Sequence, residues 1–159
     1  MIGLKQATLL LFLAITALLG YANAEQTHQL NRRAIYIGDA LFTTKNPKKE
    51  VSGRVTMTEI DKKNNVVGQF NTGFTSNNVN NYKFQINTGT SCKKIGKKLY
   101  DVTKLMKGKF QINNGATSAF SFQTKEFTLS GKKSVGGKVF IVLKNGSRIG
   151  CAVIKKLRT

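Results

Sequence analysis

Short runs of β-branched and aromatic residues, separated by clusters of Asn, Gly, Ser and Lys, recur along most of this chain. Such runs are typical of β-strands, and the polar clusters between them are typical of turns. In residues 51–60 the pattern also alternates, because Val51, Gly53, Val55 and Met57 fall on one face. We expect strands at residues 33–37, 51–60, 64–74, 82–87, 119–131, 137–143 and 149–157. Residues 97–108 alone suggest a turn or two of helix, so the sequence predicts an all-β sandwich or barrel.

The chain begins with an apolar run, residues 7–19, preceded by a single basic residue, Lys5. This run is short for a membrane span, and Ala22 and Ala24 follow it in the spacing that signal peptidase accepts. We therefore predict a secretory signal peptide over residues 1–24, with an uncleaved membrane anchor as the alternative. Residues 25–32 would be a polar tail and residues 33–159 a single β domain, secreted into the extracellular space.

Two cysteines, Cys92 and Cys151, are present in the whole sequence. In a secreted chain an even pair is typical of one disulfide, with two free thiols as the alternative. The bridge would close a loop of about 60 residues, which corresponds to roughly 4 kcal/mol in the chain-entropy model.

Positive charge dominates the composition. The chain carries a formal net charge of +19, and the predicted signal peptide contains one lysine and no acid, so the mature chain would keep +18. A protein of this charge attracts polyanions: acidic glycans, anionic lipid, nucleic acid or acidic proteins. The basic residues are not interleaved with aromatic residues as they are in single-strand nucleic-acid binders.

Two segments near the C-terminus resemble one known family. The run "FTLSGKKSVGGKVFIVL" (residues 127–143) and the run "GSRIGCAVI" (residues 146–154) are similar to segments of the copper/zinc superoxide dismutase family. The shorter pieces "RAIYIGDA", "VSGRVTMTE" and "YKFQINTGTSC" resemble earlier parts of that family, in order, so the resemblance covers roughly residues 33–154. It implies a Greek-key β-sandwich or barrel, with Cys92 and Cys151 as the intrasubunit disulfide and Arg148 as the anion-guiding arginine.

The chain departs from that family at the metal site. The resemblance places Gln85 and Asn87 where the family has two copper-ligand histidines, and Leu143 where it has a further one. The loop after Cys92, which holds the other metal ligands in the family, is short and has no histidine, and the charged loop before Arg148 is cut to "KNG". The metal and electrostatic loops are therefore both shortened.

Ligand chemistry leads to the same conclusion without the family. Redox copper prefers imidazole or soft sulfur ligands, and the one histidine of the chain, His28, lies in the predicted tail. Serine and cysteine nucleophiles would lack a histidine base for the same reason. We therefore predict a pseudoenzyme that binds no metal and no other cofactor.

Basic residues gather in two segments, 92–110 and 144–159, which hold twelve Lys and Arg against one acid, Asp101. In the fold that the resemblance implies, the disulfide would bring the start of the first segment close to the second and create a basic face. An alternative is that the two segments repel each other and stay apart. The residues concerned are Lys93, Lys94, Lys97, Lys98, Lys104, Lys107, Lys109, Lys144, Arg148, Lys155, Lys156 and Arg158.

The predicted role is binding of an extracellular polyanion, such as a sulfated glycan, or of an acidic protein. Arg148 is interpreted either as a retained anion contact or, by preference, as a turn arginine that makes loop hydrogen bonds. Asn145 begins the one N-glycosylation sequon, Asn145-Gly146-Ser147. The alternatives are a divergent copper/zinc superoxide dismutase with residual superoxide metabolism and a cationic secreted effector, for which an amphipathic cationic helix would be the signature.

Overall fold

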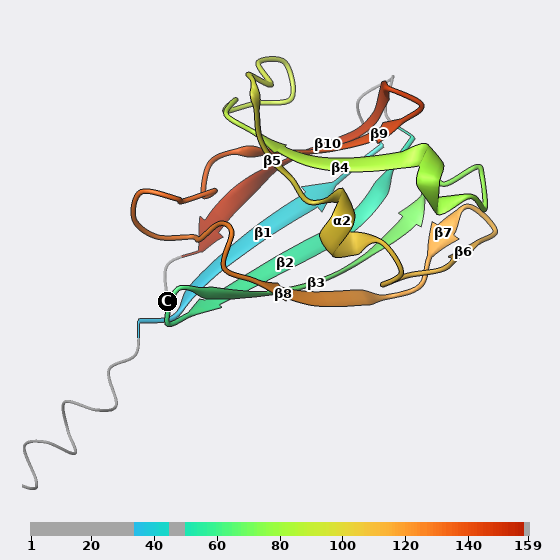
Figure 1. Ribbon diagram of the computed structural model, residues 1–159. Helices are drawn as coiled ribbons and strands as arrows, with labels where there is room; N and C mark the ends of the chain where they lie inside the picture. Colours follow the sequence, from blue (N-terminus) through green and yellow to red (C-terminus); the bar gives the residue numbers. More distant parts are fainter. Residues whose placement is uncertain (1–33, 45–49, 158–159) are drawn as a thin grey trace, which may run out of the picture. The chain divides into compact units, whose positions relative to one another are not determined.

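Antiparallel strands dominate the computed structural model, which describes residues 34–44 and 50–157 (Figure 1). The predicted all-β fold is confirmed. The predicted signal peptide (1–24), the predicted tail (25–32) and Arg158 lie outside the described residues. Every element named below belongs to the unit formed by residues 35–159. In the part of the chain that the structure describes, no helix is long and apolar enough to span a membrane.

Strands of two to eleven residues follow one another with little helix between them. In chain order the strands are β1 (Tyr36–Phe42), β2 (Ser52–Ile60), β3 (Lys63–Thr72), β4 (Tyr82–Asn87), β5 (Lys98–Asp101), β6 (Ile112–Asn113), β7 (Ala116–Thr117), β8 (Phe120–Thr124), β9 (Val139–Lys144) and β10 (Ser147–Leu157). The described residues also form a 3₁₀ helix, η1 (Val79–Asn81), and a four-residue helix, α2 (Thr103–Met106).

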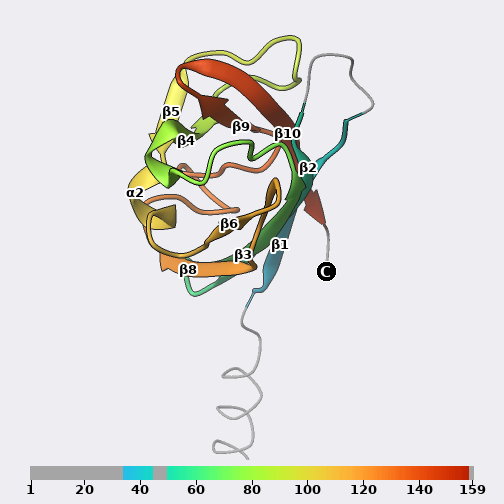
Figure 2. The ribbon, with the colours of Figure 1, turned by 90° about the vertical axis from the view of Figure 1, so that its right-hand side faces the viewer.

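Eight of these strands form one antiparallel sheet in the order β5-β4-β9-β10-β1-β2-β3-β8, and β6 pairs with β7 as a separate hairpin. The sheet curls into a half-barrel, so that β4, β5, β9 and β10 face β1, β2, β3 and β8 across the core (Figures 1 and 2). The connections from β3 to β4 and from β5 to β8 both cross from one half of the sheet to the other. These crossings give the sheet Greek-key connectivity.

Aromatic side chains fill the space between the two halves. The ring of Phe70 on β3 is completely buried, and its centroid lies 5.3 Å from that of Phe42 on β1 and 5.9 Å from that of Phe84 on β4. The alternation expected in β2 is also present, because Val55 and Met57 point into this core while Arg54 is exposed. Burial of apolar area at roughly 25 cal/mol per Å² is the main force that holds the two halves together.

The open side of the half-barrel is closed by α2. This helix lies against β4 on one half of the sheet and against β8 on the other. Its Met106 is completely buried, and Phe110, which follows it, packs on Phe84 with ring centroids 5.8 Å apart. The segment that follows β5 therefore completes the core.

A buried carboxylate ties a loop to the far end of the core. Glu59 at the end of β2 is 2% exposed, and its carboxylate accepts hydrogen bonds from the Leu129 N–H, the Ser130 N–H (2.9 Å) and the Ser130 hydroxyl (2.5 Å). Leu129 itself is completely buried. The loop of residues 125–134 is thus fastened by one side chain from β2.

The structure corrects three of the expected element boundaries. The first strand is β1, at Tyr36–Phe42, and not residues 33–37, because Gly38 and Asp39 continue it. A Cβ atom on Gly38 would lie 2.6 Å from Leu129 Cδ2, so this glycine permits close packing inside a strand and does not end one.

The other two corrections concern residues 97–108 and 119–131. The first segment holds the edge strand β5 followed by α2, and not a single helical stretch. The second segment leaves the sheet at Thr124, although Phe127 and Leu129 are buried. Their alternation resembles a continued strand because the loop fastened by Glu59 inserts them into the same core.

Candidate functional site

The predicted disulfide is present and fastens a loop to the middle of the sheet. Cys92 is bonded to Cys151 of β10, with their Cα atoms 5.8 Å apart. We refer to residues 88–97, which contain Cys92, as the disulfide loop. Cys151 lies opposite Ile141 of β9, so the bond connects the loop that follows β4 with a central strand.

Hydrogen bonds close the disulfide loop at its base. The Thr88 N–H donates to the Lys97 carbonyl at 2.9 Å, and the Gly89 N–H donates to the Ile95 carbonyl at 2.7 Å. A Cβ atom on Gly89 would lie 1.9 Å from the Lys94 carbonyl oxygen, so only glycine allows the two sides of the loop to approach this closely. The backbone of the loop is therefore held at its base as well as by the disulfide.

The three positions that the resemblance assigns to copper ligands lie on the outer face of β4 and β9. Gln85 and Asn87 pair with Ile141 and Val139, whereas their neighbours Phe84 and Ile86 point into the main core. On the same outer face Val139, Ile141 and Cys151 form a small apolar cluster, against which Cys92, Ile95, Leu143 and Val153 pack. The disulfide loop thus covers this face with apolar side chains.

Asn87 fastens the disulfide loop. Its side-chain Nδ2 donates to the Gly96 carbonyl at 3.3 Å, and the residue is 6% exposed. Its Oδ1 atom is buried without a hydrogen-bond partner among the described residues. One buried amide oxygen beside leucine, isoleucine and valine is a poor ligand set for copper, which prefers imidazole or sulfur.

The described residues also contain no group of three or more His, Cys, Asp and Glu side chains that could hold a metal ion. His28 lies outside them. The residues present at the assigned positions do not fit copper or zinc, and we derive no chemical step through either metal.

Arg148 holds the disulfide loop at a second point. It lies at the start of β10, and its Nη1 donates to the carbonyl oxygen of Cys92 at 3.1 Å. This contact is a loop hydrogen bond of the kind expected from a turn arginine. The guanidinium is exposed, so its charge remains at the surface beside the loop.

Four lysines lie on or directly after the loop that Arg148 contacts. Lys93, Lys94 and Lys97 are exposed on the disulfide loop, and Lys98 follows on β5. No acidic residue occurs between positions 88 and 100. The nearest acid along the chain is Asp101, whose carboxylate lies 4.0 Å from Lys98 Nζ. We call Lys93, Lys94, Lys97, Lys98 and Arg148 the loop cluster.

Other predicted basic residues lie elsewhere. Lys155 and Lys156 are at the opposite end of β10 from Arg148, on the order of 20 Å away at 3.3 Å per strand residue. Lys155 pairs in register with Asp39 of β1, and Lys156 Nζ lies 4.4 Å from the centre of the Tyr36 ring.

Lys144 donates a hydrogen bond to the hydroxyl of Thr75, and so it is not part of the loop cluster. Lys104, Lys107 and Lys109 lie on and just after α2. The structure therefore divides the predicted basic residues among several surfaces.

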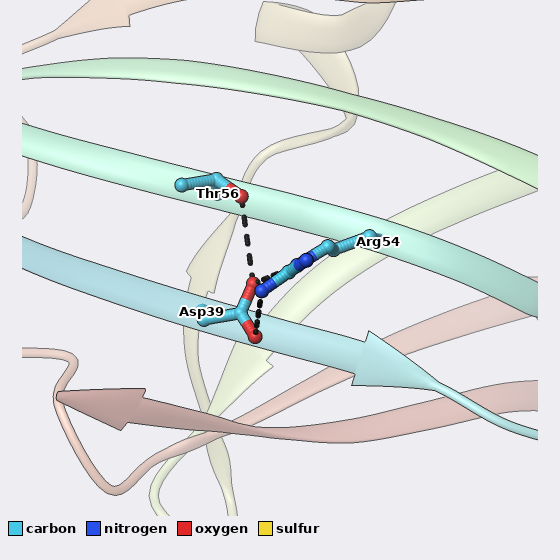
Figure 3. Close-up of polar contacts among 3 residues, drawn as sticks. All are labelled: Asp39, Arg54 and Thr56. Atoms are coloured by element: carbon cyan, nitrogen blue, oxygen red, sulfur yellow. Dashed lines mark hydrogen bonds and ion pairs between the residues drawn. The ribbon is translucent and has the colours of Figure 1, made fainter. Parts of the chain in front are cut away.

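Two of the acids are engaged within the fold and compensate little of the surface charge. Asp39 on β1 pairs with Arg54 on β2, with Arg54 Nε and Asp39 Oδ1 2.6 Å apart, and accepts a hydrogen bond from the Thr56 hydroxyl at 3.4 Å (Figure 3). The hydrogen bond and the negative charge of Asp39 together raise the pKa of Arg54. Glu59 is buried, as described above.

Asp101 stays ionised beside the lysines. Partial burial would raise the pKa of its carboxyl group, but hydrogen bonds from the Thr103 side chain and N–H and the charges of Lys98 and Lys83 outweigh this and lower the pKa. Lys83 was not among the residues predicted from sequence. Its position becomes notable only when β4 is seen to lie beside α2.

Asn145 occupies an exposed hairpin turn. Its φ is 48° and that of Gly146 is 84°, as a two-residue type I′ turn between β9 and β10 requires. The sequon is therefore exposed on the folded domain, and its last residue, Ser147, directly precedes Arg148 of the loop cluster.

No protein-family model matches the chain. No curated protein matches it either.

Proposed function

We propose that this chain is a secreted, non-catalytic binding module, similar to copper/zinc superoxide dismutase, that binds an extracellular sulfated glycan through the loop cluster. One observation carries the proposal. The disulfide, the Asn87 side chain and the Arg148 guanidinium together fix the disulfide loop, which carries three lysines. Lys98 of β5 and Arg148 of β10 add to its charge, and the nearest acid along the chain is Asp101 at the end of β5. Because the lysines stand on a fastened loop, less conformational entropy is lost when an anion binds them.

The same features argue against the alternatives. A copper-based dismutase is disfavoured because the assigned ligand positions hold Gln85, Asn87 and Leu143, none of which is a good copper ligand. The folded domain has a strand and a four-residue helix at residues 97–108, and this arrangement disfavours an effector that acts through an amphipathic cationic helix. An acidic protein is a second partner class, and the glycan is favoured because the loop cluster lacks a broad apolar surface around its charges.

Charge reversal of the loop lysines tests the proposal. We expect the quadruple variant Lys93→Glu, Lys94→Glu, Lys97→Glu, Lys98→Glu to lose most of its affinity for heparin. A lysine near an anionic surface contributes about 1 kcal/mol, so four of them correspond to a loss of up to about a thousand-fold. Affinity is measured by calorimetry and by the salt concentration at which the protein elutes from a heparin column.

The matched control reverses four exposed lysines on other elements: Lys63, Lys125, Lys132 and Lys133. Both variants have the same net charge, so equal losses would show that total charge alone determines binding. Elution of the wild type near physiological salt would contradict the proposal itself, since charge-driven binding weakens only as the Debye length falls from about 10 Å at 0.1 M toward 3 Å at 1 M. Tighter binding to an acidic protein than to heparin would favour the second partner class.

Metal analysis gives an independent prediction. We expect the purified protein, after incubation with copper and zinc and removal of weakly bound ions, to retain well below one equivalent of either metal. The reason is the apolar cluster around Asn87 and Leu143. Retention of one tightly held copper per chain, together with turnover of superoxide, would show that the divergent dismutase is the correct interpretation.

A further inference from the structure

A pocket of about 190 Å³ opens between β4, η1 and α2, separate from the loop cluster. Apolar residues line its floor: Val79, which is half-buried, and Tyr82 and Phe84, which are 0% and 1% exposed. Lys83, Lys104 and Lys107 also line the pocket. Lys104 lies on α2, and Lys107 directly follows its last residue. We call this the β4–α2 pocket.

The walls of the β4–α2 pocket are held by hydrogen bonds. The Thr103 hydroxyl accepts from the Phe84 N–H at 3.0 Å and donates to the Phe84 carbonyl at 3.3 Å, so the first residue of α2 is fastened to β4. The Tyr82 hydroxyl accepts from the Ser76 N–H at 2.9 Å. The pocket is therefore preformed, and a ligand would bind without ordering its walls.

A second hollow of about 480 Å³ continues from the pocket. It shares Lys83, Thr103 and Lys104 with the first and reaches Asp101. On the neighbouring strand Lys98 pairs with Asn87, at the end of β4 where the disulfide loop begins. One lysine on each strand, Lys83 of β4 and Lys98 of β5, thus connects the β4–α2 pocket with the loop cluster, and Asp101 lies between them opposite Gln85. We call these two residues the lysine row.

Size and chemistry together limit what the pocket can hold. Its volume is that of roughly six water molecules at about 30 Å³ each, and it is smaller than the 300–1,000 Å³ of most sites for drug-sized ligands. Inorganic sulfate would leave the apolar floor uncovered, and a neutral sugar would leave the lysines without partners. A single sugar ring with sulfate groups matches both, because its C–H face is apolar and its substituents are anionic.

We propose that the β4–α2 pocket binds one sulfated ring of a glycan chain, and that the chain continues along the lysine row to the loop cluster. This inference rests on the proposed function and identifies the part of the partner that gives it specificity. Asp101 is the one acid along this path, so it repels a sulfate group placed beside it. It thereby limits which substitution pattern the row accepts.

The direct test is titration of the ¹⁵N-labelled protein with a fully sulfated heparin disaccharide. We expect amide shifts concentrated at Lys83, Thr103, Lys104 and Lys107. Two parallel titrations separate the contributions: the desulfated disaccharide and inorganic sulfate should each bind at least ten-fold more weakly. Equal affinity for inorganic sulfate, or shifts spread evenly over all lysines, would overturn the assignment of the pocket.

A variant without a change of charge makes the test sharper. Asn80 is exposed at the pocket, so Asn80→Trp should fill it and weaken disaccharide binding at least ten-fold. The control is Asn71→Trp, at an exposed position of β3, which should leave the affinity unchanged. Asp101→Asn should strengthen binding two- to five-fold by removing the repulsion. Unchanged affinity in Asn80→Trp, or weaker binding in a correctly folded Asp101→Asn, would contradict the proposal.

The two proposals can fail separately. If heparin retention depends on the loop lysines while the disaccharide leaves the pocket amides unshifted, the proposed function stands and the pocket assignment is wrong. If the disaccharide shifts the pocket amides but reversal of the loop lysines has no more effect than the control, the pocket binds a sulfated ring and the loop cluster is not the glycan surface.

Discussion

Replacement of Cys92 and Cys151 by alanine is expected to lower the free energy of unfolding by about 4 kcal/mol. The two cysteines are 59 residues apart in sequence, and a cross-link over this length removes that much chain entropy from the unfolded state. Alanine is chosen because Cys151 is buried in an apolar cluster, where a serine hydroxyl would be left without a partner. The change is measured by urea unfolding of both proteins.

Reduction of the wild-type protein with a thiol provides the control. It should cause a similar loss, because it breaks the same bond without a change of sequence. Heparin affinity should also decrease in the double alanine variant, since Lys93 and Lys94 would then lie on a loop held by hydrogen bonds alone. A loss below about 1 kcal/mol would contradict the expectation that the cross-link acts by restricting the unfolded chain.

Truncation of Glu59 has the second largest expected effect. Glu59→Ala removes the acceptor of three hydrogen bonds and leaves the N–H groups of Leu129 and Ser130 without a partner. A buried donor without a partner costs about 1–3 kcal/mol, so a loss of about 3 kcal/mol is expected once relief from burying the charge is taken into account. Thermal and urea unfolding measure it.

Two comparisons make this prediction specific. Glu59→Gln keeps one acceptor oxygen and should lose about half as much stability. Glu126→Ala removes an exposed carboxylate near the same loop and should change stability by less than about 0.5 kcal/mol. If Glu59→Ala proves as stable as wild type, the loop of residues 125–134 must be held by its other contacts: the buried side chains of Phe127 and Leu129, and the hydrogen bond that Asn64 Nδ2 donates to the Phe127 carbonyl at 2.7 Å.

The alternation of apolar residues was enough to predict the sheet. From Val51, which precedes β2, to Met57 within it, every second residue is buried against the core, so the apolar alternation matches the strand geometry. The alternation gave a wrong prediction where alternate residues are buried but do not belong to a strand. Phe127 and Leu129 alternate as strand residues do, yet they enter the core from a loop, and the Glu59 carboxylate that explains this lies about 70 residues away in sequence.

The short strand β5 was missed for a different reason. It is an edge strand whose residues are half-buried or exposed, so no apolar alternation marks it. The candidate site was partly predictable: the disulfide followed from an even pair of cysteines. Lys83 could not be found from sequence, because only the packing of α2 on β4 brings it beside Lys104.

The separation of Lys155 and Lys156 from the loop cluster could not be predicted from the sequence either. They are close to Arg148 in sequence, but an extended strand of eleven residues places its two ends far apart. Counting charges over a stretch of sequence assumes that those residues are close in space. In an extended β-strand, the same residues are distributed along the whole length of the strand.

The half-barrel leaves the sheet with two ends, β5 and β8. Edge strands offer backbone groups to a second molecule, and lysine beside an edge is a common protection against such pairing. Lys98 lies on β5 itself, and the chain has a net charge of +19. Electrostatic repulsion between copies therefore disfavours pairing of this edge strand with a second molecule. A long polyanion that neutralises this row removes the repulsion while gathering several copies on one chain. Under the proposed function, the glycan that the lysines attract would therefore also weaken their protection against aggregation.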